Sequence, residues 1–173
     1  MKILTLVDGS EHSLKALDYA VNLLSQKNSI SSRQHNDKIQ TKHKIIILNI
    51  LQPLKLSDEV VQHFKSINKE RKSSLKKYLD DVNSAMKDAW IKKLSNLKSK
   101  YEKTGILIST KIVKGTHSSL FVAYSIIKFA EDEKVDMITV GSVGTGGIHE
   151  KKSLGSISRN VAEISTRPVL IVP

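Results

Sequence analysis

Short apolar runs alternate with amphipathic stretches along this chain. Between the runs, apolar residues recur at steps of three or four, which is the spacing of a helix that buries one face. The runs themselves are rich in aliphatic and β-branched residues and are typical of strands: KILTLV (2–7), IIILNIL (45–51), ILISTKIV (106–113), VDMITVG (135–141) and PVLIVP (168–173). Because strands and helices alternate, the pattern predicts an α/β fold with five parallel strands and right-handed crossovers.

The first predicted helix begins directly after the first strand. Ser10 is a natural N-cap, and Glu11 lies in the first turn, where the helix dipole favours a carboxylate. The apolar spacing ends at Leu24. From Ser25 to Lys44 the sequence is polar, and we expect a long flexible loop inserted there. Since unstructured loops of this length are uncommon inside a compact domain, an element that the pattern does not reveal is the alternative.

A long basic amphipathic helix is predicted from residue 65 to residue 103, and Thr104-Gly105 ends it. This segment holds 12 Lys and Arg against 5 Asp and Glu, so it carries +7 of the formal net charge of +11. Its bases are nearly all lysine, and it lacks the arginine and aromatic side chains that recognise bases or stack on single strands. A solvated helix face is the favoured interpretation, and a nucleic-acid partner is disfavoured. The apolar positions expected to contact the core are Leu75, Leu79, Val82, Met86, Trp90, Leu94, Leu97 and Tyr101.

Composition limits the chemistry and the setting of the protein. The chain has 173 residues, 39% of them hydrophobic, which suits a single domain over residues 1–173. It has no cysteine, so disulfides, thiolate nucleophiles and Cys-ligated zinc are excluded. No apolar run reaches the length of a membrane span, and the first one stops at Asp8, too short for a signal peptide. We expect a cytoplasmic protein with no membrane partner.

A glycine-rich segment, GSVGTGGIHEKKSLGSIS (141–158), follows the fourth predicted strand. Glycine lets backbone amides approach a ligand closely, and Gly155-Ser156 opens a helix whose free N–H groups suit an anion, most often phosphate. Asp8 to Ser10 and Ile50 to Gln52 lie at the carboxyl ends of other strands, at the same edge of the sheet, where parallel sheets bind ligands. The phosphate loop GxxxxGK[ST] is absent, and His149 occupies the third glycine position of the dinucleotide fingerprint GxGxxG.

Four segments are similar to the universal stress protein family: ILTLVDGSEHSLKAL (3–17), VDMITVGSVG (135–144), GSISRNVAEIS (155–165) and PVLIVP (168–173). They cover both ends of the chain, whereas residues 25–105 match only in pattern. The ATP-binding branch of the family is described by the motif G-2x-G-9x-G-[ST]. Gly141, Gly144 and Gly155-Ser156 satisfy it, except that the last spacer has ten residues. The resemblance implies a three-layer, doubly wound open sheet of the adenine-nucleotide alpha-hydrolase-like class.

Carried over position by position, the resemblance implies a nucleotide site. Asp8 would lie near the ribose and the Mg²⁺-bound phosphates, and Ile50 would offer backbone groups and an apolar surface to adenine. The residues that would line the ribose and phosphates are Gly141, Gly144, Gly155, Ser156 and Ile157. Plainer roles remain open: Asp8 as a turn former, Ser156 as a helix N-cap, and the spacer residues 149–152 as a solvated loop tip rather than a phosphate contact.

Nothing in the sequence resembles a nucleophile with a positioned base. The resemblance implies binding of ATP or a related adenine nucleotide, with at most slow hydrolysis or self-phosphorylation, so that ATP would act as a regulator. It also implies a homodimer through Val169–Val172, a short apolar strand at a sheet edge. Two alternatives remain. One is a family member that does not bind nucleotide and acts through protein partners, which the ten-residue spacer favours; the other is a basic nucleic-acid-associated protein, argued only from residues 65–103.

Overall fold

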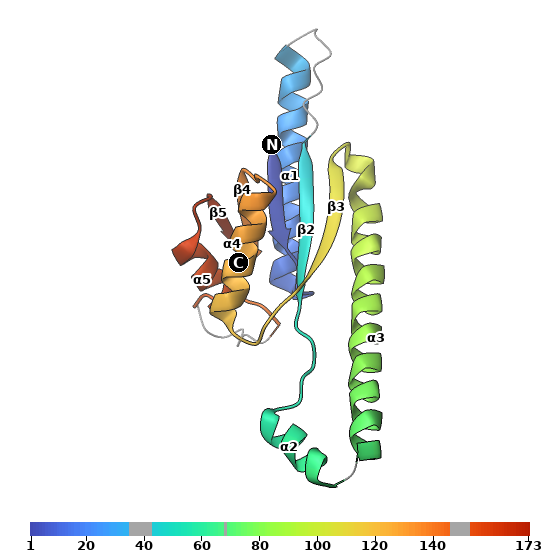
Figure 1. Cartoon of the computed structure of the whole chain (residues 1–173). Coiled ribbons are helices and arrows are strands. Elements are labelled where there is room, and N and C mark those ends of the chain that lie inside the picture. Colours follow the sequence, from blue (N-terminus) through green and yellow to red (C-terminus); the bar gives the residue numbers. More distant parts are fainter. Residues whose placement is uncertain (35–42, 68, 146–152) are drawn as a thin grey trace.

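The computed structural model describes residues 1–34, 43–67, 69–145 and 153–173. In this part of the chain, five parallel strands form one sheet in the order β3-β2-β1-β4-β5, which confirms the predicted α/β fold (Figure 1). The strands are β1 (Lys2–Leu6), β2 (Lys44–Leu51), β3 (Leu107–Lys114), β4 (Met137–Gly141) and β5 (Val169–Val172). The strand order reverses between β1 and β4, and such a switch point is where open parallel sheets bind ligands.

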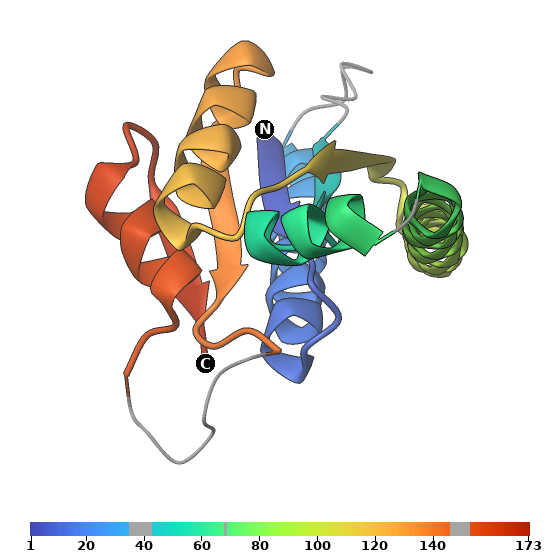
Figure 2. The ribbon, with the colours of Figure 1, turned by 60° about the horizontal axis from the view of Figure 1, so that its bottom comes forward.

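Helices cover both faces of the sheet, so the molecule has three layers. The helices are α1 (Glu11–Gln34), α2 (Asp58–Ile67), α3 (Lys69–Tyr101), α4 (Ser119–Asp132) and α5 (Ser156–Ile164). One core cluster joins Leu17 of α1 and Leu94 of α3 to Ile45 of β2. The other joins Val122 of α4 to Ile46 of β2, because successive strand side chains point to opposite faces. Figure 2 shows α4 and α5 together on one side of the sheet and α1 on the other.

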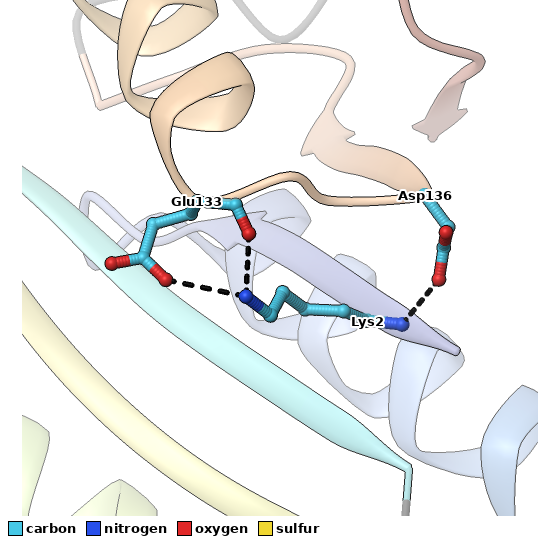
Figure 3. A network of polar contacts seen from close by, with 3 residues as sticks. All are labelled: Lys2, Glu133 and Asp136. Atoms are coloured by element: carbon cyan, nitrogen blue, oxygen red, sulfur yellow. Dashed lines mark hydrogen bonds and ion pairs between the residues drawn. The ribbon is translucent and has the colours of Figure 1, made fainter.

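A small polar network fixes the amino end of β1 (Figure 3). The Lys2 backbone N–H donates to the Asp136 carboxylate over 2.6 Å. The Lys2 ammonium donates to the Glu133 carbonyl oxygen over 2.5 Å and to Glu133 Oε2 over 3.3 Å. Glu133 and Asp136 lie between α4 and β4, so the network joins the starts of the two strands that flank the switch point.

The prediction of a loop from Ser25 to Lys44 is wrong for residues 25–34, which are helical. α1 continues to Gln34, and Lys44 is already the first residue of β2. Residues 25–34 contain neither glycine nor proline, so nothing in them ends a helix whose preceding turns are anchored by buried residues. Residues 35–42 lie outside the described residues.

The basic helix is confirmed from Lys69 to Tyr101, but residues 65–67 belong to the separate helix α2. A 3₁₀ turn follows α3, and Gly105 ends it with a φ of 74°, the left-handed conformation predicted for a helix-ending glycine. Leu94 and Tyr101, near the end of α3, are buried on the sheet. Its first half extends past the carboxyl ends of the strands, beside α2 (Figure 1). We call α2 together with residues 69–89 of α3 the helical arm.

β5 forms one edge of the sheet and pairs with β4. The side chains of Val169, Leu170 and Ile171 are half-buried, whereas Val172 is buried. Within the described ranges, no helix combines the length and the apolar content that a membrane span requires.

Candidate functional site

A cavity of about 430 Å³ lies at the carboxyl ends of β1, β2 and β4 and extends under the first turns of α4 and α5. Its floor is apolar and comes from both strands and helices: Leu6, Leu48, Val122, Ile126 and Val140. All seven residues that the resemblance assigns to nucleotide contacts line this one cavity: Asp8, Ile50, Gly141, Gly144, Gly155, Ser156 and Ile157. Segments that are more than 100 residues apart in the sequence are therefore brought together at the switch point.

Asp8 connects the β1–α1 turn to the glycine loop. Its Oδ1 accepts hydrogen bonds from the Ser10 backbone N–H over 2.9 Å and from the Ser10 hydroxyl over 2.6 Å. Its Oδ2 accepts a hydrogen bond from the Thr145 N–H over 3.1 Å. Asp8 therefore acts as a turn former, the alternative role considered above. It also lines the cavity, so the two roles are compatible.

The hydrogen bonds also set the charge of Asp8. Partial burial raises the pKa of the carboxyl, but hydrogen bonding from Ser10, Ser13 and Thr145 together lowers it by more, so the pKa lies below its usual value of 3.8. Asp8 is therefore ionised at neutral pH. A carboxylate has about four lone-pair directions, so it can accept a further hydrogen bond or contact a cation.

Two glycines of the loop have a structural reason that the sequence does not reveal. A Cβ at Gly141 would lie 2.6 Å from the His12 carbonyl carbon and 2.7 Å from the Ser13 nitrogen. A Cβ at Gly144 would lie 2.6 Å from Asp8 Oδ2. All three distances are shorter than real Cβ atoms show. Glycine therefore lets the end of β4 pack against the start of α1, and it lets the following loop approach the Asp8 carboxylate.

The start of α5 supplies the third side of the cavity. The Gly155 N–H donates to the Ser142 carbonyl oxygen over 2.8 Å, and the Ser158 hydroxyl donates to the same oxygen over 2.8 Å. Gly155 occupies the N-cap position. Ser156 is therefore the first helical residue and not the N-cap that was considered for it. The first intrahelical bond runs from Arg159 to the Gly155 carbonyl oxygen, which leaves the N–H groups of the first turn without helical acceptors beside the cavity.

The opposite wall, at the end of β2, contains residues to which the sequence analysis assigned no role. Gln52 lines the cavity next to Ile50. The Gly115 N–H donates to the Leu51 carbonyl oxygen over 2.8 Å, and a Cβ at Gly115 would lie 2.5 Å from Ile50 Cγ2. A glycine directly after a predicted strand was the signal available for this wall.

The cavity offers little to a metal ion by itself. Among the residues that the structure describes, no group of three His, Cys, Asp or Glu side chains could hold a metal. Asp8 is the charged side chain among the described lining residues. Mg²⁺ is commonly held by one or two carboxylates together with substrate phosphates, so Asp8 fits Mg²⁺ only in company with a phosphate ligand. Residues 149–152, considered for phosphate contact, lie outside the described part of the chain.

Comparisons with known proteins agree with this architecture. The model of the universal stress protein family matches residues 40–173. Universal stress protein YxiE of Bacillus subtilis is 30% identical over 171 residues, which are 99% of this chain and 97% of YxiE. Universal stress protein MJ0577 of Methanocaldococcus jannaschii is 32% identical over 99 residues, or 57% of each protein. The solved structure of MJ0577 has a TM-score of 0.69 to this chain at 26% identity and covers 99% of this chain and 94% of that one.

Two further solved structures share the fold and contain nucleotides. A universal stress protein in complex with cAMP has a TM-score of 0.54 at 21% identity, covering 99% of this chain and 95% of that one. A universal stress protein family protein from Arabidopsis thaliana with AMP bound has a TM-score of 0.54 at 13% identity, covering 99% and 90%. The family model spans most of the chain and YxiE matches nearly all of it. The chain therefore belongs to the universal stress protein family.

Proposed function

We propose that this protein is a regulatory module that binds ATP, or a related adenine nucleotide, in the cavity at the switch point. The observation that carries the proposal is the convergence of the seven residues assigned from the resemblance on one cavity. The cAMP and AMP complexes of proteins with the same fold support an adenine nucleotide as the ligand class.

The cavity has distinct surroundings for the parts of a nucleotide. Ile50 and the α4 residues Val122 and Ile126 offer an apolar surface on which a base can lie. Asp8, at the end of β1, is placed for a ribose hydroxyl. The glycine loop and the first turn of α5 present backbone N–H groups and the positive end of a helix dipole, which suit phosphates.

The charge of the phosphates is balanced mainly by backbone and metal in this proposal. The described lining residues include no lysine or arginine. Phosphate binding would therefore use N–H groups at the start of α5 and Mg²⁺ held between the phosphates and Asp8. Mg²⁺ would supply charge neutralisation there, and Asp8 would orient it.

Binding rather than turnover is the proposed activity. The Ser158 hydroxyl donates to the Ser142 carbonyl oxygen, which is not a base. The Ser10 hydroxyl donates to Asp8, whose lowered pKa makes the carboxylate a weak base, so neither serine is activated as a nucleophile would be. ATP would then act by stabilising one state of the protein, with at most slow hydrolysis or self-phosphorylation. The same proposal includes a cytoplasmic homodimer through the free edge of β5, Val169–Val172, which sedimentation equilibrium distinguishes from a monomer.

A second candidate function is a family member that acts through protein partners without nucleotide. Gly141 and Gly144 favour it, because their close contacts with α1 and Asp8 account for two of the motif glycines without any ligand.

The experiment is a calorimetric titration of the nucleotide-free protein with Mg²⁺-ATP, with AMP as a second ligand. We expect saturable binding near the micromolar range, with a free energy on the order of −8 kcal/mol. Gly155→Val should abolish this binding, because the added side chain would crowd the start of α5, where the Gly155 Cβ would already lie 3.4 Å from the Ser142 carbonyl oxygen. Ser153→Val, at an exposed position outside the cavity, is the matched control. If millimolar ATP produces neither heat nor a rise in Tm, the nucleotide proposal fails and the second candidate stands.

A further inference from the structure

The two walls of the cavity differ in how their polar groups are used. On the side of β1, β4 and α5, the polar side chains are bonded within the protein, as Ser10 is to Asp8 and Ser158 is to the Ser142 carbonyl oxygen. On the side of β2, the lining consists of Leu48, Ile50 and Gln52. Gln52 is thus the side chain on this wall that can form hydrogen bonds with a ligand.

The Gln52 carboxamide is available for a ligand. Its side chain is exposed, and no residue in the described ranges hydrogen-bonds to it. Gln52 thus lines the cavity, two residues after Ile50, and is exposed at the same time.

The backbone that carries Gln52 is held on both sides. Before it, the Leu51 carbonyl oxygen accepts a hydrogen bond from the Gly115 N–H, and a Cβ at Gly115 would lie 3.4 Å from Gln52 Cγ. After it, the Leu54 N–H donates to Asn83 Oδ1 over 2.7 Å, and Asn83 Nδ2 donates to the Leu54 carbonyl oxygen over 3.1 Å. Asn83 belongs to the helical arm. The arm therefore holds the segment after β2, which includes Gln52, on the side of the cavity where the base would lie.

A carboxamide presents a hydrogen-bond donor and an acceptor side by side. Adenine presents the complementary pair, because its 6-amino group lies next to the acceptor nitrogens N1 and N7. We infer that Gln52 is the side chain by which this cavity recognises an adenine base, in addition to the backbone groups that Ile50 would offer, and that Asn83 and Gly115 are its positioning residues. This inference rests on the proposed nucleotide function and adds a specificity determinant to it.

The test compares two ligands that differ only at the group in question. Dissociation constants are measured for Mg²⁺-ATP and for Mg²⁺-purine riboside triphosphate, which lacks the 6-amino group. The wild type should prefer ATP by roughly tenfold to a hundredfold, the range expected for a bidentate amide–adenine pair. Gln52→Ala should reduce this preference severalfold, mainly by weakening ATP, while the backbone groups of Ile50 remain. Gln62→Ala, an exposed glutamine on α2 away from the cavity, is the matched control and should keep the wild-type preference.

The outcomes separate this inference from the function on which it rests. If the wild type binds neither triphosphate, the proposed function fails and the inference fails with it. If the wild type binds both equally, or if Gln52→Ala keeps the full preference for ATP, the inference is overturned while nucleotide binding stands. Gln52→Glu gives a second readout, because a carboxylate keeps the acceptor for the 6-amino group and loses the donor to N1 or N7. It should weaken the binding of both triphosphates and keep a preference for ATP, without changing Tm.

Discussion

The junction of β1, β4 and α5 and the helical arm are built in contrasting ways. At the junction, a Cβ at Gly141 would meet backbone atoms of His12 and Ser13, and a Cβ at Gly144 would meet the Asp8 carboxylate, so neither position has room for a methyl group. In the arm, the apolar stripe of α3 is only half-buried at Leu75, Leu79, Val82 and Met86, and Tyr78 is 65% exposed. The junction is therefore specified by steric contacts, whereas the arm is specified by helix propensity and a few contacts with its neighbours.

The contrast has a consequence for binding, because the junction lines the cavity and the arm is hydrogen-bonded to Leu54, in the segment that carries Gln52. The junction supplies backbone N–H groups whose positions are fixed before any ligand arrives, which suits the phosphate end of a nucleotide. The arm is connected to the cavity by the segment that carries Gln52. This side of the cavity, where the base would lie, can therefore adjust to a ligand more easily than the junction can. Substitutions in the two regions should therefore differ in both size and kind of effect.

The largest effect is expected from Gly141→Ala. The new Cβ would lie 2.6 Å from the His12 carbonyl carbon, and backbone cannot rotate away as a flexible side chain can. We expect a loss of roughly 3 kcal/mol in the free energy of unfolding, the upper part of the range for overpacking, together with loss of ATP binding. Urea unfolding and calorimetry measure the two.

Gly105→Ala is the matched control for this substitution. No atom lies within 4 Å of a Cβ at Gly105, so only its φ of 74° opposes alanine. We expect a loss of about 1 to 2 kcal/mol from that conformation and unchanged ATP binding. If Gly141→Ala is no more destabilising than this control, the junction is looser than the close contacts indicate.

An intermediate effect is expected from Asp8→Asn. The lowered pKa of Asp8 means that the carboxylate stabilises the fold above pH 3.8, its ordinary value, and that this contribution is lost as pH falls through the lower folded value. At pH 7 we expect a loss of about 1 kcal/mol, kept small because the side chain is exposed to the cavity. As pH falls below 3.8 and through the lower folded pKa, the difference from the wild type should shrink, and it should disappear once the wild-type carboxyl is protonated.

Thermal unfolding from pH 2 to pH 7 tests this dependence. Asp132→Asn, at an exposed position near the end of α4, changes the same charge without removing hydrogen bonds to Ser10 and Thr145. Equal pH profiles for the two variants would show that the Asp8 bonds do not stabilise the junction.

The sequence predicted the junction better than the arm, for physical reasons. Strands such as IIILNIL and the spacing of the glycines can be recognised from the local sequence. The resemblance assigned Asp8, Ile50 and the glycines to one site, and these residues line one cavity. The extension of α1 to Gln34 was missed because a polar helix that continues from buried turns has no apolar period of its own. The role of Gly115 and the clamp between Asn83 and Leu54 depend on contacts across the fold, which no local pattern contains.

Asn83→Ala should have the smallest effect on stability. It also tests most directly whether the arm and the cavity are coupled. Its two hydrogen bonds to Leu54 are exposed, so the free energy of unfolding should fall by less than about 1 kcal/mol. The preference for ATP over purine riboside triphosphate should nevertheless fall severalfold, because the segment that carries Gln52 loses its anchor. Asn96→Ala, at an exposed position on the same helix, controls for the higher helix propensity of alanine.

If stability changes as expected while the preference for ATP does not, the arm is a surface independent of the cavity. If the preference falls, the arm and the cavity form one unit, and the loosely packed region sets the selectivity of a site whose phosphate end the tightly packed region builds.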